Sequence, residues 1–340
     1  MRNGTILLCL MAAASAAGCG GSTAVAPSAE NGAPAAVSLD GRGFSAAVFS
    51  PLHALAPGAK ITKGIYAGEY DNGAILGYAG TNPRNKPPAC TLTTGAYVNG
   101  IAVDGNANLI VPVGSTRTIE IFKGPSMCGT KLASLSDPYG QPSDATSFDA
   151  QTGGIVIGNI FDGQSGSSPG SVSVCSVATG CGENLTDPNL NEVFGVAQAK
   201  NRDCWASGLH GSLAVLIYFK GCDSAGRVAK HFLNENPGGL EIDKDGHILA
   251  IDAFEPELYV YKGCNPGCVL IGGPFPLHGE AIFGHLNAGS TTFATASFDN
   301  SSIDVYSYSP TNLTYLHSFY NGLNSSYNVE GVAVVPRSRE

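Results

Sequence analysis

Short apolar segments of four to six residues recur along most of the chain, and no stretch shows sustained helical periodicity. Between residues 237 and 272 the pattern predicts four strands, at 239–243, 247–253, 257–262 and 269–272. The breaks between them are Asp245-Gly246, Glu255-Pro256 and Asn265-Pro266-Gly267, which are turn-forming combinations. This part of the chain is therefore expected to form antiparallel strands joined by short turns.

The same four-strand unit repeats along the chain. The phrase Gly100-Ile-Ala-Val-Asp104 recurs as Gly239-Leu-Glu-Ile-Asp243, and weaker copies begin near residues 147, 195, 282 and 331, at intervals of 43 to 49 residues. An aromatic residue followed by Lys-Gly recurs later in several units, at residues 122–124, 219–221 and 261–263. Four strands in every 40–50 residues are typical of a β-propeller blade.

The two ends of the repeat region predict how the ring closes. The last unit stops after a single strand, 331–336, while the first unit starts at residue 63 and lacks that strand. Joining them completes a sixth blade and removes an open sheet edge. We therefore expect an all-β fold, a six-bladed β-propeller of four-stranded antiparallel blades, closed when the C-terminal strand joins the N-terminal blade. A seven-bladed ring is the alternative if residues 44–51 contribute more strands.

Composition and charge narrow the classes of protein. Hydrophobic residues make up 43 % of the chain and charged residues 13 %, so there is ample material for a core. The 27 acidic and 18 basic side chains give a formal net charge of −9. This balance disfavours nucleic-acid binding, which needs clustered Lys and Arg. Composition also argues against a coiled coil and a polytopic membrane protein.

The N-terminus predicts export. Arg2 precedes an apolar run at 5–17 that is too short to span a bilayer but typical of a secretory signal. The run ends in Ala16-Ala17-Gly18-Cys19, which resembles a bacterial lipobox, although Ala16 stands where Leu is commoner. We expect a signal peptide (1–18), a flexible linker anchored by lipid on Cys19 (19–60), the propeller (61–336) and a tail (337–340). Plain signal cleavage and secretion is the alternative.

Eight cysteines remain once residues 1–18 are removed and Cys19 carries lipid. An even number in an exported protein indicates disulfides. Turn-forming residues between the thiols favour Cys264–Cys268 and Cys175–Cys181, and the remaining cysteines then pair as Cys204–Cys222 and Cys90–Cys128. Zinc is the alternative, but no second Cys pair or His pair with ligand spacing accompanies them.

The repeat motif resembles a known superfamily. The run from Pro237 to Asp243, with Gly246 following, and the run from Asn99 to Asp104 are similar to a Pro-x-Gly-Φ-Ala-Φ-Asp…Gly motif, where Φ is apolar. This motif is found in six-bladed propellers of the NHL-repeat, streptogramin-lyase-like and SMP-30/gluconolactonase-like kind. The resemblance covers roughly residues 60–336 and implies a scaffold that hosts many functions.

The resemblance also implies a place for a metal. SMP-30-like lactonases hold a divalent cation at the channel mouth with a Glu, Asn and Asp set. The residues expected at the corresponding positions are Asn99, Thr146, Phe194, Gly238, Ala281 and Glu330. Asn99 and Glu330 match, but Gly238 stands where an acid is needed, and Ca²⁺ prefers six to eight oxygen ligands. Asn99 and Glu330 are therefore expected to line a solvated channel. The alternative is a lactonase, another hydrolase or a lyase that uses Ca²⁺ or another divalent metal at these two residues.

Three further motifs have simpler interpretations. Gly166-Ser-Ser168-Pro-Gly170 matches Gly-x-Ser-x-Gly, but it lies in a Gly/Ser-rich loop without the helix that a nucleophile elbow requires. Asp243-Lys-Asp245-Gly246 favours a β-turn over a calcium loop. The aromatic residues before Lys-Gly favour packing between blades over a ligand-stacking ladder. A lyase would need a histidine in the channel, for which His210 and His285 are candidates.

The function expected from these observations is that of a binding or interaction module at the bacterial cell envelope, with no resolved catalytic site and no cofactor. The ligand would be a protein, peptide or glycan that contacts a loop-lined face or the channel mouth. We expect no nucleic-acid partner, membrane contact only through the N-terminal lipid, and a monomer.

Overall fold

The computed structural model describes residues 63–83, 86–147, 154–160, 169–223, 225–232, 236–324 and 328–335. In these ranges the chain forms 24 strands and one 3₁₀ turn, η1 (Lys220–Cys222). No helix in this part of the chain is long and apolar enough to cross a membrane. The predicted signal peptide (1–18), Cys19, the linker (19–60), Ser168 and the tail (337–340) lie outside the described residues.

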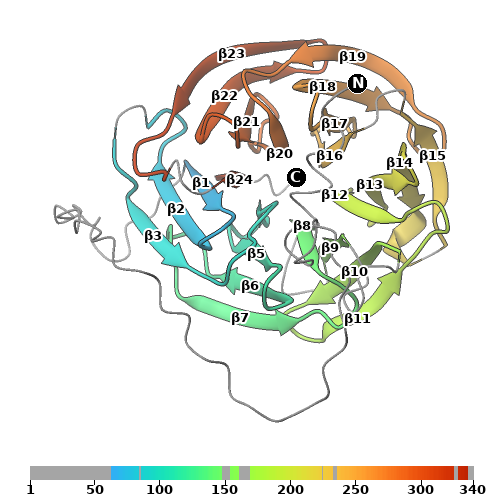
Figure 1. The fold of residues 1–340 in the computed structure, drawn as a ribbon, viewed down its shortest axis with the longest axis horizontal. Coiled ribbons are helices and arrows are strands. Elements are labelled where there is room, and N and C mark those ends of the chain that lie inside the picture. The colour runs from blue at the N-terminus through green and yellow to red at the C-terminus, as the bar shows by residue number, and fades with distance from the viewer. Residues whose placement is uncertain are drawn as a thin grey trace, which may run out of the picture. The chain divides into compact units, whose positions relative to one another are not determined.

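The strands form six four-stranded antiparallel sheets, the blades of a propeller (Figure 1). From the centre outward, blade 1 consists of β24 (Val329–Val335), β1 (Gly64–Glu69), β2 (Ala74–Ala79) and β3 (Cys90–Thr93). Blade 2 consists of β4 (Ala102–Val103), β5 (Leu109–Val113), β6 (Thr118–Phe122) and β7 (Lys131–Ser136). Blade 3 consists of β8 (Pro142–Ser147), β9 (Ile155–Asn159), β10 (Ser171–Ser176) and β11 (Gly180–Leu185).

The other three blades follow the same order. Blade 4 consists of β12 (Glu192–Gln198), β13 (Cys204–His210), β14 (Leu213–Phe219) and β15 (Arg227–His231). Blade 5 consists of β16 (Pro237–Ile242), β17 (Ile248–Asp252), β18 (Glu257–Lys262) and β19 (Val269–Pro276). Blade 6 consists of β20 (Ala281–Leu286), β21 (Thr292–Ser297), β22 (Ser302–Ser309) and β23 (Asn312–Phe319).

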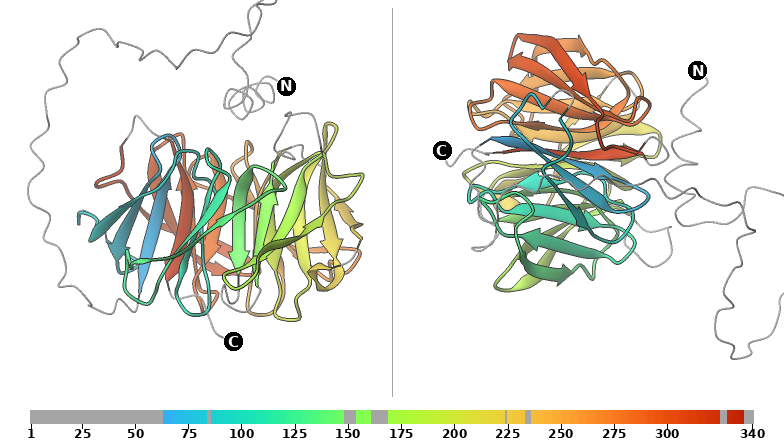
Figure 2. Two further views of the ribbon diagram at one scale, coloured as in Figure 1. Left: turned by 90° about the horizontal axis from the view of Figure 1, so that it is seen from below. Right: turned by 90° about the vertical axis from the view of Figure 1, so that its left-hand side faces the viewer.

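The ring closes as the sequence predicts. β24 pairs antiparallel with β1, so that Ile65 lies opposite Val334 and Ala67 opposite Val332. The six innermost strands contact one another in turn around the centre. In side view the loops gather on two opposite faces (Figure 2). We call the face where the chain enters each innermost strand the entry face, and the opposite one the exit face.

The apolar core is divided among the six blade-to-blade interfaces. Each of the six clusters of buried apolar side chains combines residues from two neighbouring blades. The aromatic residues of the Lys-Gly phrases, Phe122, Phe219 and Tyr261, are at most 5 % exposed and belong to these clusters. The prediction that they pack between blades is therefore confirmed.

Close contact between innermost strands explains the repeated glycine. A β-carbon on Gly195 of β12 would lie 2.6 Å from the carbonyl oxygen of Gly238, and one on Gly331 of β24 would lie 2.5 Å from that of Asn99. Both distances are shorter than real β-carbon contacts, so no larger residue fits without a backbone shift. The glycine of the repeat motif is thus required by the approach of neighbouring blades at the centre of the ring.

A β-bulge precedes this close contact in several blades. The bulged residues include Ser143, Phe194, Gly238 and Glu330. In blade 6 the bulge lies between Ala281 and Gly284. Bulges bend a strand and change the direction in which its side chains point.

All four predicted cysteine pairs are joined as disulfides: Cys90–Cys128, Cys175–Cys181, Cys204–Cys222 and Cys264–Cys268. Cys175 and Cys181 also face each other across β10 and β11. Cys264 and Cys268 close the turn between β18 and β19.

Candidate functional site

A cavity of about 480 Å³ opens on the exit face, within the size range of small-ligand sites. Its walls are the turns that follow the innermost strands of blades 4, 5 and 6, together with the turn between β18 and β19. The cavity is therefore shared by three consecutive blades. Sequence analysis anticipated a loop-lined face but could not place it, because these turns lie far apart in the chain.

Asp243 fixes the central wall of the cavity. One of its carboxylate oxygens, Oδ1, accepts hydrogen bonds from the backbone N–H groups of Asp245 (2.9 Å) and His247 (2.9 Å). The other, Oδ2, lies 2.8 Å from Nδ1 of His247 and accepts a hydrogen bond from the hydroxyl of Tyr308 (3.1 Å). Gly246 N–H donates to the carbonyl of Asp243, which confirms the predicted β-turn.

The other two turns have comparable side-chain caps. Asp203 accepts hydrogen bonds from Gly221 N–H and from the side-chain amide of Asn201, each at 2.8 Å. Asn287 Oδ1 accepts hydrogen bonds from the N–H groups of Thr291 and Thr292. Hydrogen bonds from side chains to the backbone within a turn, and between neighbouring turns, hold the backbone in one conformation, so the cavity is bounded by well-defined turns.

Trp205, the single tryptophan of the chain, forms part of the cavity lining. It is 7 % exposed, and its indole N–H donates to the carbonyl oxygen of Cys264 at 2.7 Å. That hydrogen bond links blade 4 to the disulfide-closed turn of blade 5. The indole ring therefore gives one wall of the cavity a fixed apolar surface and a spectroscopic reporter.

The charge of the lining is negative. Its acidic residues are Asp203, Glu241, Asp243 and Asp245, and its basic residues are Lys200 and Lys244. The Lys244 ammonium forms an exposed ion pair with Asp245 at 2.8 Å, which leaves an excess of carboxylates. A negative lining in a recessed site attracts cations.

The channel-mouth residues predicted from the sequence, Asn99 and Glu330, lie on the entry face at the start of the innermost strands of blades 2 and 1. Their backbones are adjacent, because Gly331 abuts the carbonyl of Asn99. Asn99 is 1 % and Glu330 7 % exposed. Asn99 Oδ1 and Glu330 Oε2 are both buried without a hydrogen-bond partner among the described residues.

Burial is the main reason that the pKa of Glu330 rises to about 8, and the negative charge of Asp71 adds to the effect. Glu330 in turn contributes to raising the pKa of Tyr70, after the larger effect of burial. The ring of Tyr70 lies 5.2 Å from that of Tyr97. Perturbed carboxyl groups of this kind are common at functional sites.

This donor set fits a calcium ion poorly. Asn99 and Glu330 offer two unpaired oxygens, whereas calcium takes six to eight. Two groups of three potential ligands occur among the described residues, and both lie elsewhere. One is Asp243, Asp245 and His247, where Asp243 caps the turn, and the other contains the disulfide Cys175–Cys181.

The other positions expected at the channel mouth are only partly equivalent. Phe194 and Gly238 lie at the bulges, as Glu330 does. Thr146 and Ala281 do not, because they pair regularly with Val156 and Ser297. The repeat spacing alone therefore does not locate the bulge in blades 3 and 6.

Side chains of three innermost strands accept hydrogen bonds from backbone N–H groups of neighbouring innermost strands, a role that sequence analysis missed. Asp144 accepts a hydrogen bond from Val196 N–H (2.8 Å), and Glu241 accepts one from Leu286 N–H (3.1 Å). His285 Nδ1 accepts one from Val334 N–H (3.2 Å). His285 lies on an innermost strand and makes a structural contact there, whereas His210 is exposed at the end of β13.

Comparison with known proteins finds similarity to solved structures and none to known sequences. No family model and no curated protein sequence matches it. It is similar to a chain of a nidogen/laminin complex, with 12 % identity, a TM-score of 0.57 and 81 % and 99 % of the two chains covered. It is also similar to a protein of unknown function from Bacteroides caccae, with 7 % identity, a TM-score of 0.56 and 82 % and 100 % covered.

A third similar structure is a catalytically inactive virginiamycin B lyase from Staphylococcus aureus, crystallised with quinupristin. The identity is 11 %, the TM-score 0.51, and 78 % of this chain and 87 % of the lyase are covered. The chain is thus a six-bladed β-propeller with a lyase among its structural neighbours. At such identities the likeness concerns the fold alone.

Proposed function

We propose that the protein is a binding module whose exit-face cavity takes a small ligand, or part of a larger one, that carries an ammonium group. The observation that carries this proposal is the cavity of about 480 Å³ with four acidic and two basic residues in its lining. The capped turns support it, because a preorganised wall loses little entropy when a ligand binds. The excess negative charge would attract the ammonium group of the ligand, and the aliphatic part of the ligand would pack against Trp205.

The test uses three five-carbon probes that differ in charge: 1,5-diaminopentane, 1,5-pentanediol and glutarate. Trp205 reports binding directly, because it is the single tryptophan and lines the cavity. We expect the diamine to change its fluorescence saturably, the diol to bind more weakly and glutarate not to bind. Equal responses to diamine and glutarate, or no response to the diamine, would contradict the proposal.

A matched pair of variants locates the effect. Asp245→Asn removes an exposed charge from the cavity rim, and Glu183→Gln removes one from the exposed surface of β11. We expect D245N to weaken diamine binding several-fold and E183Q to leave it unchanged. Equal losses in both variants would indicate a general effect of net charge instead of binding at the cavity.

We also propose that this module is exported and anchored through lipid on Cys19. Four disulfides support an oxidising compartment. Expression in a bacterial host with a labelled fatty acid should label the wild-type chain. Cys19→Ala should abolish labelling and release the protein from the membrane fraction, and unlabelled wild-type protein would contradict the anchor.

The alternative function is a metal-dependent hydrolase or lyase at the channel mouth. The buried, unpaired oxygens of Glu330 and Asn99 favour it. Titration with Ca²⁺ followed by thermal unfolding separates the two proposals. Under the binding-module proposal Ca²⁺ and EDTA leave the melting temperature of the wild type unchanged. A Ca²⁺-dependent rise that Glu330→Gln abolishes would favour the metal-dependent enzyme.

A further inference from the structure

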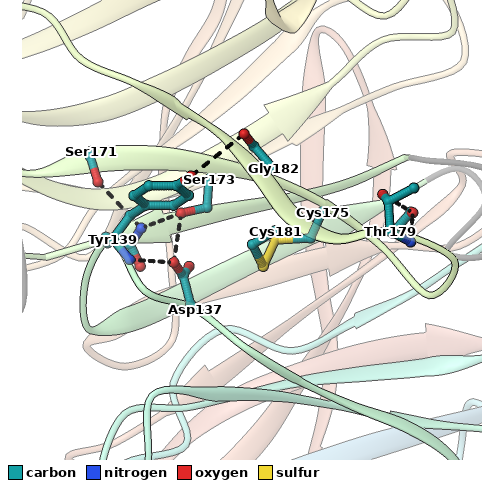
Figure 3. Close-up of a disulfide and its surroundings, with 10 residues drawn as sticks. Asp137, Tyr139, Ser171, Ser173, Cys175, Thr179, Cys181 and Gly182 are labelled. Carbon is teal, nitrogen blue, oxygen red and sulfur yellow. Dashed lines mark hydrogen bonds between the residues drawn. A yellow bond between two sulfur atoms is a disulfide. The ribbon is translucent and has the colours of Figure 1, made fainter.

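A buried carboxyl group lies beside one of the four disulfides (Figure 3). One carboxylate oxygen of Asp137 and the sulfur atoms of Cys175 and Cys181 are all within 4.8 Å of one another. Asp137 is 1 % exposed and follows β7 in blade 2, whereas the cysteines belong to blade 3. The carboxyl group and the disulfide therefore meet at a blade-to-blade interface.

The two oxygens of Asp137 have different surroundings. Oδ1 accepts hydrogen bonds from the backbone N–H of Tyr139 (2.9 Å) and the hydroxyl of Ser173 (3.0 Å), whereas Oδ2 is buried without a partner. Burial raises the pKa of Asp137, and the hydrogen bonds from Tyr139, Ser173 and Asn159 lower it by less. None of these neighbours is charged. Burial thus favours the protonated carboxyl, which has one hydrogen to donate.

The disulfide itself is asymmetric. Cys175 is 2 % exposed within an apolar cluster, whereas Cys181 packs against the same cluster but is only half-buried. An incoming thiolate can therefore reach the Cys181 sulfur more readily. Displacement at that sulfur leaves the negative charge on Cys175, and a thiolate in apolar surroundings is unfavourable unless it is protonated.

We propose that Cys175–Cys181 is a site of thiol–disulfide exchange with an external dithiol, at which Asp137 protonates the departing Cys175 sulfur. A thiolate of the dithiol attacks Cys181 Sγ, the S–S bond breaks, and its electron pair moves to Cys175 Sγ, which takes the proton from Asp137. The second thiolate of the dithiol then attacks the mixed disulfide and releases Cys181. The protein disulfide gains two electrons, the dithiol becomes a disulfide, and Asp137 recovers a proton from water.

Cys264–Cys268 provides a matched reference within the same molecule. It also pairs a buried cysteine with a half-buried one and closes a short turn. No acidic or histidine side chain of the described residues lies within 4.8 Å of both of its sulfur atoms. If proton donation assists exchange, Cys175–Cys181 should open faster than Cys264–Cys268.

The experiment follows reduction of the whole protein by dithiothreitol at neutral pH. Alkylation at timed intervals and peptide mass mapping give one rate for each disulfide. We expect Cys175–Cys181 to open several-fold faster than Cys264–Cys268, and Asp137→Asn to slow it about tenfold, since loss of leaving-group stabilisation lowers exchange rates.

Asp187→Asn is the control for general damage. Asp187 is 6 % exposed in the next loop of the entry face, and its Oδ1 accepts a backbone hydrogen bond from Asn189, two residues on, as Asp137 does from Tyr139. We expect D187N to leave all four rates unchanged. Equal rates for Cys175–Cys181 in wild type and D137N, or a slowing shared by all disulfides, would overturn the proposal.

Discussion

Gly195 in blade 4 lies against the carbonyl oxygen of Gly238 in blade 5, with room for no β-carbon between them. The contact joins two innermost strands, and its two glycines lie 43 residues apart in the chain. It shows that the repeated glycine is not a turn residue. Its role is to let neighbouring blades approach at the centre of the ring.

We predict that Gly195→Ala destabilises the protein strongly, because the new β-carbon would lie 2.6 Å from that carbonyl and 2.7 Å from the Cα of Gly239. Relief requires a backbone shift in a packed interface, which typically costs about 1–3 kcal/mol or more. Urea unfolding measures the change in the free energy of unfolding. Gly182→Ala is the control, because nothing lies within 4 Å of a β-carbon there. Similar stabilities of the two variants would contradict the close-approach explanation.

We predict that Asp243 acts as a structural cap and not as a metal ligand. Asp243→Ala leaves two backbone donors, a histidine and a tyrosine hydroxyl without an acceptor, so we expect a loss of about 2–4 kcal/mol. Asp243→Asn keeps an acceptor oxygen and should lose less. The free energies of unfolding of both variants provide the test. Were the group a metal site, EDTA would destabilise the wild type as much as D243A does.

We predict that Glu330→Gln makes the protein less sensitive to alkaline pH. The pKa of Glu330 is about 8 in the folded state, against about 4.3 in an unfolded chain. Between these values the folded state holds a proton that the unfolded state has released, so wild-type stability falls as pH rises from about 4.3 through 8. The stability advantage of E330Q over wild type should grow by up to about 4 kcal/mol from pH 5 to pH 9.

Urea unfolding at five pH values in this range provides the measurement. Asp252, whose pKa burial raises to about 6, titrates in both proteins and cancels in the difference. Glu183→Gln removes the same kind of charge from an exposed site and should show no such trend. A constant difference between E330Q and wild type across the range would mean that Glu330 ionises normally in the folded protein.

The fold was predictable because each blade repeats the same local pattern. Alternating apolar residues and turn pairs located the strand now seen as β18 without error, and the incomplete units at the two ends predicted the pairing of β24 with β1. The beginnings of the innermost strands were less accurate. β16 starts at Pro237 and β24 at Val329, two residues earlier than expected in each case, because bulges extend these strands.

The candidate site was only partly predictable. Glu330 and Asn99 could be found because they precede the repeated glycine, but their unpaired oxygens depend on the packing of blades 1 and 2. The exit-face cavity brings Trp205 of β13 together with Asp245 and Asn287 of two separate turns. Asp137 meets Cys175 and Cys181 across a blade interface. Contacts between residues of different blades depend on how the side chains of neighbouring repeats pack, and no local sequence pattern encodes that packing.

A circular permutant tests the closure of the ring most directly. Val335 lies opposite Gly64 in the antiparallel pair, so a two-residue Asn-Gly turn should join them when the chain is reopened after Asn324. We predict that this permutant unfolds cooperatively and with the same stability, within about 1 kcal/mol, as one joined by a twenty-residue Gly/Ser linker, because loop length alone has a small effect. A permutant that folds with the long linker and fails to fold with the short one would show that the two strands are not neighbours.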